Sequence, residues 1–173
     1  MRKKVLVLDT SVLCVWLKVP GMETCGPRND TWDYARVEAT LRENQAAGAT
    51  FVLPLASIVE TGNHISQLGG DRFETAQRLA KVMRFAADET SPWAAFGDQA
   101  PLWSPERLKA LADTWPALAA RRLSLGDATI QDVAEMYAQM HCEVELLTGD
   151  QGLKAHAPAG PVLRPRRRKC RLP

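Results

Sequence analysis

Short apolar runs separated by helix-like segments constrain the fold of this chain more than any other feature. The runs lie at residues 5–8, 50–53 and 144–147, and residues 161–163 form a weaker fourth candidate. A strand buried on both faces of a parallel sheet has this composition, because neither face meets water. We therefore predict a parallel sheet built from strands that are distant in the sequence.

Helical patterns fill the intervals between these runs. We predict helices over residues 32–47 with Asp30 as a cap, over 57–68, over 71–87, over 105–120 with Ser104 as N-cap, and from Asp127 onward. Apolar stripes at helical spacing are formed by Ile130, Val133, Ala134, Tyr137 and Ala138, and by Phe73, Ala76, Ala80 and Met83. Strands that alternate with helices indicate an α/β fold with helices on both sides of the sheet.

The length of 173 residues suits one compact domain over residues 1–163 and a basic tail over residues 164–173. Two segments rich in proline and glycine, residues 20–29 and 88–103, are predicted to be long loops. The net charge of +2 comes from 22 basic and 20 acidic residues. Six of the basic residues stand in residues 164–171, so the rest of the chain is acidic, at −4. The tail could hold phosphate groups, contact the acidic body or be disordered.

The N-terminus and the cysteines bear on the compartment. Asp9 interrupts the first apolar stretch too early for a signal peptide, and no run reaches the roughly 18 apolar residues of a membrane helix. The four cysteines form neither a CxxC pair nor a zinc pattern, which indicates a reducing compartment. We expect a cytoplasmic protein without a membrane segment.

Four acidic residues stand where a parallel α/β sheet binds ligands, beyond the carboxyl ends of its strands. Asp9 and Asp150 follow the first and third apolar runs, Glu60 lies in the helix after the second, and Asp127 opens a helix. Carboxylates brought together raise each other's pKa, and a divalent cation such as Mg²⁺ or Mn²⁺ relieves that repulsion. One or two such ions could activate water for attack on a phosphodiester.

Each acid also has a structural interpretation. Glu60 could close a capping box that begins at Ser57, and Asp127 could be only an N-cap. Asp150 stands in a turn-like segment where aspartate is common. Asp9 is the hardest to explain this way, because a buried strand rarely ends in an aspartate without a partner.

Four segments in this order resemble the PIN-domain family. They are VLDTS at residues 7–11, Glu60 after the second strand, GDATI at 126–130 and LTGDQGL at 147–153. Together they span residues 5–153, most of the chain. The long interval 68–123, with its 88–103 insertion, and the arginine-rich tail depart from the minimal pattern of the family.

The resemblance implies a three-layer α/β/α sandwich and an endoribonuclease that depends on Mg²⁺ or Mn²⁺. Asp9, Glu60, Asp127 and Asp150 would be its catalytic, metal-binding acids. The hydroxyl of Thr148, and that of Thr10 or Ser11, would orient an acid or a water. RNA would be the substrate, and many similar proteins are toxins of toxin–antitoxin pairs, so an antitoxin protein is an expected kind of partner. Asp132 falls about 140° around the helix from Asp127 and is left out of the site.

Other interpretations stay open. The chain could be a catalytically silent PIN-like module that binds RNA or protein. A phosphatase that begins at Asp9 is disfavoured, because Ser11 stands where a second aspartate is needed. The loop aromatics Trp93, Phe96 and Trp103 could stack bases, pin the loop to the core or fill a homodimer interface. His64 could assist Glu60 or lie on the helix surface.

Overall fold

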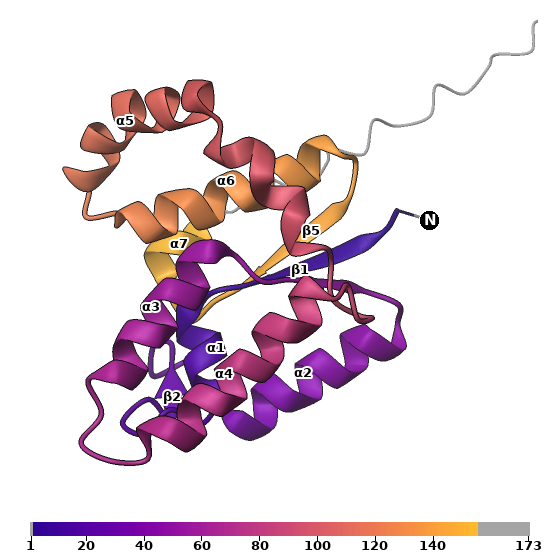
Figure 1. The fold of residues 1–173 in the computed structure, drawn as a ribbon, viewed down its shortest axis with the longest axis vertical. Helices are drawn as coiled ribbons and strands as arrows, with labels where there is room; N and C mark the ends of the chain where they lie inside the picture. The colour runs from indigo at the N-terminus through magenta and orange to yellow at the C-terminus, as the bar shows by residue number, and fades with distance from the viewer. Residues whose placement is uncertain (1, 156–173) are drawn as a thin grey trace, which may run out of the picture.

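The computed structural model describes residues 2–155, and its centre is a three-stranded parallel sheet (Figure 1). The strands are β1 (Lys4–Leu8), β4 (Thr50–Val52) and β5 (Glu143–Leu147), in the order β4-β1-β5. Val5 of β1 pairs with Thr50 of β4, and Leu8 pairs with Leu147 of β5. The apolar runs therefore form the predicted sheet, with β1 in the middle.

Helices cover the sheet and account for most of the remaining chain. They are α1 (Thr10–Trp16), α2 (Tyr34–Ala46), α3 (Leu55–Ser66), α4 (Arg72–Ala87), α5 (Pro105–Ala119), α6 (Leu125–Gln139), α7 (Gln151–Ala155) and the 3₁₀ helix η1 (Phe96–Trp103). A two-stranded antiparallel hairpin, β2 (Thr24–Cys25) and β3 (Trp32–Asp33), lies beside α1. Within residues 2–155, no helix is both long and apolar enough to cross a bilayer.

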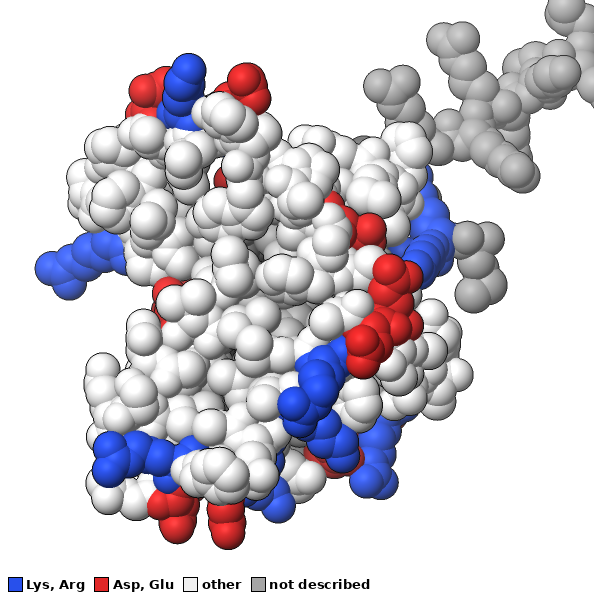
Figure 2. All heavy atoms as spheres, in the orientation of Figure 1, with Lys and Arg blue, Asp and Glu red and all other residues white. Residues whose placement is uncertain are grey.

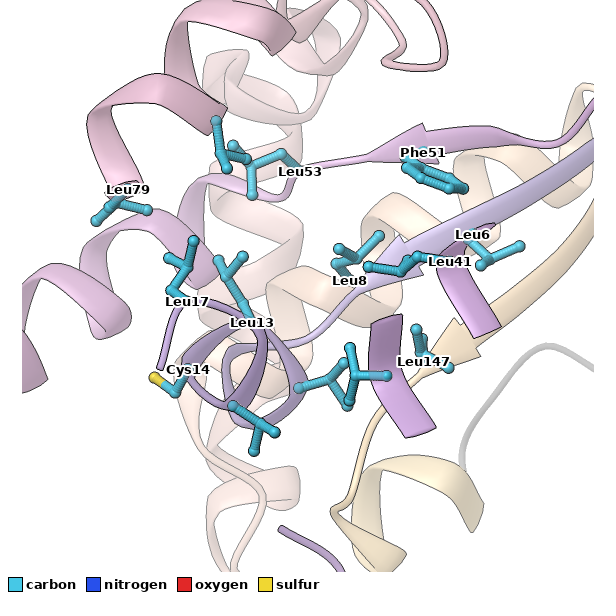
Figure 3. Packing of buried hydrophobic residues seen from close by; sticks show 14 of the residues in the cluster. Leu6, Leu8, Leu13, Cys14, Leu17, Leu41, Phe51, Leu53, Leu79 and Leu147 are labelled. Carbon is cyan, nitrogen blue, oxygen red and sulfur yellow. The ribbon is translucent and has the colours of Figure 1, made fainter. Parts of the chain in front are cut away.

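Alternate residues of β1 point to opposite faces and so belong to two different cores. Leu6 and Leu8 pack in the cluster covered by α1, α2, α3 and α4, part of which Figure 3 shows. Val5 and Val7 pack in a second cluster, against Ile130 and other residues of α6. Helices on both faces make this an α/β/α arrangement, as predicted.

Helix α1 was not predicted, because residues 10–16 form a nearly continuous apolar run without a helical period. Its inner residues 12–15 are all buried. A helix surrounded by protein carries apolar residues on all sides, and so it resembles a buried strand in sequence. Asp9 caps the helix, since its side chain accepts a hydrogen bond from the Ser11 amide at 3.3 Å.

One predicted helix start and one apolar stripe are corrected by the structure. Helix α2 begins after Asp33, whose carboxylate accepts from the Arg36 amide at 2.8 Å, and not after Asp30. In α4 the buried residues are Thr75, Leu79, Val82 and Ala86. The predicted stripe lies on the solvent side, where Phe73 is 75% exposed. Helix α4 carries two apolar stripes, and packing against α3 selects one of them.

The segment predicted as a long loop at residues 88–103 is partly ordered by the sheet. Phe51 of β4 donates its amide to Pro92 O at 2.8 Å and accepts from the Ala94 amide at 2.8 Å. The Trp93 ring is buried and packs edge-on against the Phe51 ring, with centroids 5.7 Å apart. For Trp93, the interpretation that it pins the loop to the core is confirmed. The candidate strand 161–163 and the basic tail lie outside the described residues.

Candidate functional site

Asp9 occupies the turn between β1 and α1 and is only 3% exposed. Its Oδ2 accepts hydrogen bonds from Ser11 Oγ at 2.6 Å and from Thr148 Oγ1 at 2.7 Å. Burial raises the pKa of the Asp9 carboxyl, and the hydrogen bonds from Ser11 and Thr148 oppose this rise. No lysine or arginine within residues 2–155 forms an ion pair with Asp9. A buried carboxylate held only by hydroxyl and amide donors favours a cation nearby.

Glu60 is tied to the residue that follows Asp9. Its Oε2 accepts a hydrogen bond from Thr10 Oγ1 at 2.8 Å, across 50 positions of sequence. The capping-box interpretation of Glu60 is wrong, because α3 begins at Leu55 and Ser57 is already inside it. The Ser57 hydroxyl instead donates to Leu8 O at 2.8 Å and fastens α3 to the end of β1. Glu60 is thus held in place by tertiary contacts.

Gly126 connects the Glu60 carboxylate to the start of α6. A Cβ at position 126 would collide with Glu60 Oε1, so the carboxylate lies directly over the glycine backbone. Gly126 directly precedes Asp127, and this contact therefore brings Glu60 to the N-terminal turn that carries Asp127. A side chain at position 126 would therefore require the Glu60 carboxylate to shift.

Asp127 is the third residue of α6 and forms a capping box with the N-cap residue, Ser124. The Asp127 amide donates to Ser124 Oγ at 2.9 Å. In return, Asp127 Oδ2 accepts from the Ser124 hydroxyl at 2.8 Å and from the Ser124 amide at 3.2 Å. This carboxylate therefore has a local structural role, which is more than the simple N-cap considered from the sequence.

Thr148 links Asp150 to Asp9. Its side chain is fully buried, and while it donates to Asp9 Oδ2 it accepts from the Asp150 amide at 2.9 Å. Asp150 Oδ1 accepts from the Leu153 amide at 2.9 Å and so caps the start of α7. The Gly149 amide donates to Ser11 Oγ at 3.0 Å. Two hydroxyls, those of Thr148 and Ser11, thus connect the segment after β5 to the Asp9 carboxylate.

The predicted residues fall into two groups. Thr148 is hydrogen-bonded to Asp9, and Glu60 to Thr10, across long stretches of sequence, whereas Asp127 and Asp150 use their carboxylates in local caps. Within residues 2–155, no three or more Asp, Glu, His or Cys side chains are arranged to hold a metal ion. The chemistry of the donors nevertheless fits a hard divalent cation.

Sequence reasoning missed the contribution of the β2–β3 hairpin to this region. A Cβ on Gly149 would lie 2.6 Å from Gly26 N and 2.7 Å from Cys25 Sγ, so the hairpin touches the segment after β5. Burial raises the pKa of the Cys25 thiol, and a hydrogen bond with Ser11 opposes this effect. The Gly26-Pro27 pair marks a turn, but nothing in its spacing shows what the turn touches.

Two further residues weighed from the sequence lie away from the acids. His64 is exposed on α3, which favours the helix-surface interpretation. Asp132 forms an ion pair with Arg107 at 3.4 Å, consistent with leaving it out of the site. Burial raises the pKa of the Asp132 carboxyl, and Arg107 opposes the rise.

An apolar hollow of about 440 Å³ opens beside Glu60 and Gly126. Its walls are apolar residues of α3, α5 and α6 together with Trp103 of η1, which is 42% exposed. Figure 2 shows one face of the molecule, on which uncharged side chains cover much of the surface between groups of acidic and basic ones. The lining residues of the hollow place an apolar surface beside Glu60.

Comparison with known protein families, curated proteins and solved structures finds no match for this chain.

Proposed function

We propose that this chain is an endoribonuclease that hydrolyses RNA phosphodiester bonds with Mg²⁺ or Mn²⁺, and that Asp9, Glu60, Asp127 and Asp150 bind the metal. The observation that carries the proposal is the burial of Asp9 without a cationic partner within residues 2–155. Asp9 is a charged residue, 3% exposed, at the carboxyl end of the central strand, with hydroxyl and amide donors. A site of this kind in an open parallel sheet lies where such folds bind ligands.

In this proposal the hydroxyl residues position the acids, and the acids bind the metal. Thr148 and Ser11 donate hydrogen bonds to Asp9, and Thr10, the next residue in the chain, donates one to Glu60. Asp127 and Asp150 stand at the first turns of α6 and α7 and would turn from their caps toward the cation. Bound there, a divalent ion supplies a Lewis acid for the phosphate and lowers the pKa of the attacking water.

The alternative is a catalytically silent module that binds RNA or protein. The capping roles of Asp127 and Asp150 support it, because both carboxylates have a structural use without a metal. The two functions differ in their response to a chelator. Binding of RNA that is unchanged by EDTA, together with an absence of cleavage, would favour the silent module.

The test is incubation of the full chain with total RNA and Mn²⁺, beside the Asp9→Asn variant. We expect cleavage that EDTA and Asp9→Asn both abolish. Calorimetric titration of Mn²⁺ gives a second readout that does not depend on choosing the right RNA. Glu135→Gln is the matched control, because Glu135 is an exposed acid on α6. If the parent chain neither cuts RNA nor binds Mn²⁺ more tightly than Asp9→Asn does, the proposal fails.

The resemblance to the PIN-domain family extends the proposal to partners and location. A toxin of this kind acts on cytoplasmic RNA and is held inactive by an antitoxin protein. Co-purification of the chain with the product of a small neighbouring gene would test this role. Sedimentation of the purified chain would test for a homodimer.

A further inference from the structure

Two cationic side chains converge on one carboxylate next to the candidate site. Lys154 Nζ lies 2.6 Å from Asp30 Oδ2, and Arg36 Nη2 lies 2.7 Å from Asp30 Oδ1. The guanidinium of Arg36 also stacks over the Trp32 ring, with its Cζ 3.9 Å from the ring centroid. Two cations and one anion leave this cluster with a formal charge of +1.

Helix α7 and the β2–β3 hairpin both place the cluster close to Asp150. Lys154 belongs to α7, and its amide donates to Asp150 O at 3.0 Å, which places Lys154 one helical turn after Asp150. Asp30 belongs to the loop of the hairpin whose residues Cys25 and Gly26 touch Gly149. The cations thus stand beside the segment that connects Thr148 to Asp150.

The two side chains have donors available for a ligand. Arg36 is 43% exposed and Lys154 is 33% exposed. A guanidinium carries five N–H donors and an ammonium carries three. The hydrogen bonds of these two groups go to Asp30 and, for Arg36 Nη1, to Thr31 O at 2.8 Å. Stacking on Trp32 fixes the plane of the guanidinium, which suits the two-point binding of a phosphate.

We propose that Arg36 and Lys154 bind a backbone phosphate of the RNA strand, next to the phosphodiester that is cleaved, and that this phosphate replaces Asp30 as their partner. The inference rests on the proposed function. A cluster of acids repels a polyanion, so a strand needs cations nearby to stay on the site. Phosphate contacts of this kind position a strand without reading its sequence.

The first experiment measures affinity for a labelled single-stranded RNA over a series of salt concentrations, in EDTA and in the Asp9→Asn background. Arg36→Ala and Lys154→Ala should each weaken binding by about two- to fivefold. Each should also lower the slope of log affinity against log salt by about 0.7. Arg42→Ala is the control, because Arg42 lies on the same helix, is 77% exposed and pairs with Glu38. The full chain is used throughout, so the basic tail contributes equally to every measurement.

A second variant separates phosphate binding from a structural role of the ion pairs. Asp30→Asn removes the anion that competes with the phosphate but keeps the shape of the side chain. We expect about twofold tighter RNA binding. If the cluster only fastened α7 to the hairpin, Asp30→Asn would weaken binding and lower the melting temperature. That outcome would overturn the inference, as would an Arg36→Ala, Lys154→Ala double variant that binds like Arg42→Ala.

Additional measurements show whether the contact is to phosphate in general. They also show which of the two proposals fails when a result is negative. Single-stranded DNA of the same sequence should show the same drop in slope, since the contact is to the phosphate, and inorganic phosphate at similar ionic strength should compete. A chain that cleaves RNA with Mn²⁺ while the double variant binds normally refutes this inference alone. A chain that shows the loss in slope but never cleaves refutes the nuclease proposal alone.

Discussion

The two halves of the candidate site are built in different ways. Asp9 caps α1 through Ser11, but Asp9 and Glu60 each also accept a long-range hydrogen bond, which spans 139 and 50 positions of sequence respectively. Around Asp127 and Asp150 the bonds reach only three positions along the chain. Long-range contacts hold the first half, whereas the second half would have to give up helix caps in order to bind the proposed metal. If the proposal is right, metal affinity should depend mainly on the first half and local helix stability on the second.

Among the variants that test this comparison, Asp9→Asn should have the largest effect on RNA cleavage and on stabilisation by Mn²⁺. The amide keeps the shape of the side chain but removes the charge that a divalent cation needs. We expect RNA cleavage to fall by at least about a hundredfold, since the bound metal contributes several kcal/mol to the reaction. The parent chain should also gain about 2.7 kcal/mol of unfolding free energy at a Mn²⁺ concentration of 100 times Kd. A variant that is stabilised by Mn²⁺ as much as the parent would contradict the prediction.

Gly126→Ala should separate metal binding from stability. The added methyl group would displace the Glu60 carboxylate, so we expect roughly tenfold weaker Mn²⁺ binding by calorimetry. Alanine favours a helix by up to about 1 kcal/mol over glycine. This gain should offset the strain of moving the Glu60 side chain, so we expect little change in the melting temperature. Gly62→Ala is the matched control, because Gly62 lies in α3 with open space around its Cβ position. Equal Mn²⁺ affinities in the two variants would show that Glu60 is not a ligand.

Thr148→Val and Ser124→Ala compare the long-range half with the local half. Valine keeps the shape of Thr148 but removes the hydroxyl that joins Asp9 to the Asp150 amide. We expect about tenfold or greater loss of Mn²⁺ affinity for Thr148→Val. For Ser124→Ala we expect a loss of about 1 kcal/mol in unfolding free energy from the missing cap. Its Mn²⁺ affinity should stay near that of the parent, and an opposite pattern would refute the division into two halves.

The smallest effect is a dependence of stability on pH that originates at Asp9. Burial raises the pKa of this carboxyl in the folded chain above its ordinary value of 3.8. The folded state therefore holds the proton more tightly than the unfolded state does. In the absence of metal, the contribution of Asp9 to unfolding free energy should fall as pH rises from about 3.8 through the folded pKa. Chemical denaturation in EDTA should show this fall in the parent chain and not in Asp9→Asn.

Local sequence patterns correctly predicted those helices and strands that can be recognised from their own residues alone. The run at residues 5–8 predicted the central strand, because a strand between two partners is buried on both faces. The helix that carries Ile130 and Val133 was predicted from its single apolar face. Ser104 was also predicted correctly as the N-cap of α5, where proline takes the first helical position. In each case the deciding interaction lies within the element or is repeated along it.

Features that depend on distant partners could not be predicted. The sequence placed Asp9 and Asp150 at strand ends, and the resemblance implied that Thr148 orients an acid or a water. Nothing in the local pattern showed that Thr148 would contact both Asp9 and the Asp150 amide. The capping-box role of Glu60 was excluded by the start of α3 at Leu55, after Pro54, where Ser57 instead contacts the end of β1. Contact between the hairpin and Gly149 links residues far apart in the chain and leaves no periodic pattern.

Helix α5 contains no buried residue, although it connects η1 to α6. It lies outermost on its side of the molecule (Figure 1). A segment with so little buried surface can open while the sheet stays folded, so its amide hydrogens should exchange with solvent long before those of β1. The same property makes α5 the segment where an insertion or a protease cut should be tolerated best, and where the chain can vary without disturbing the strand that ends in Asp9.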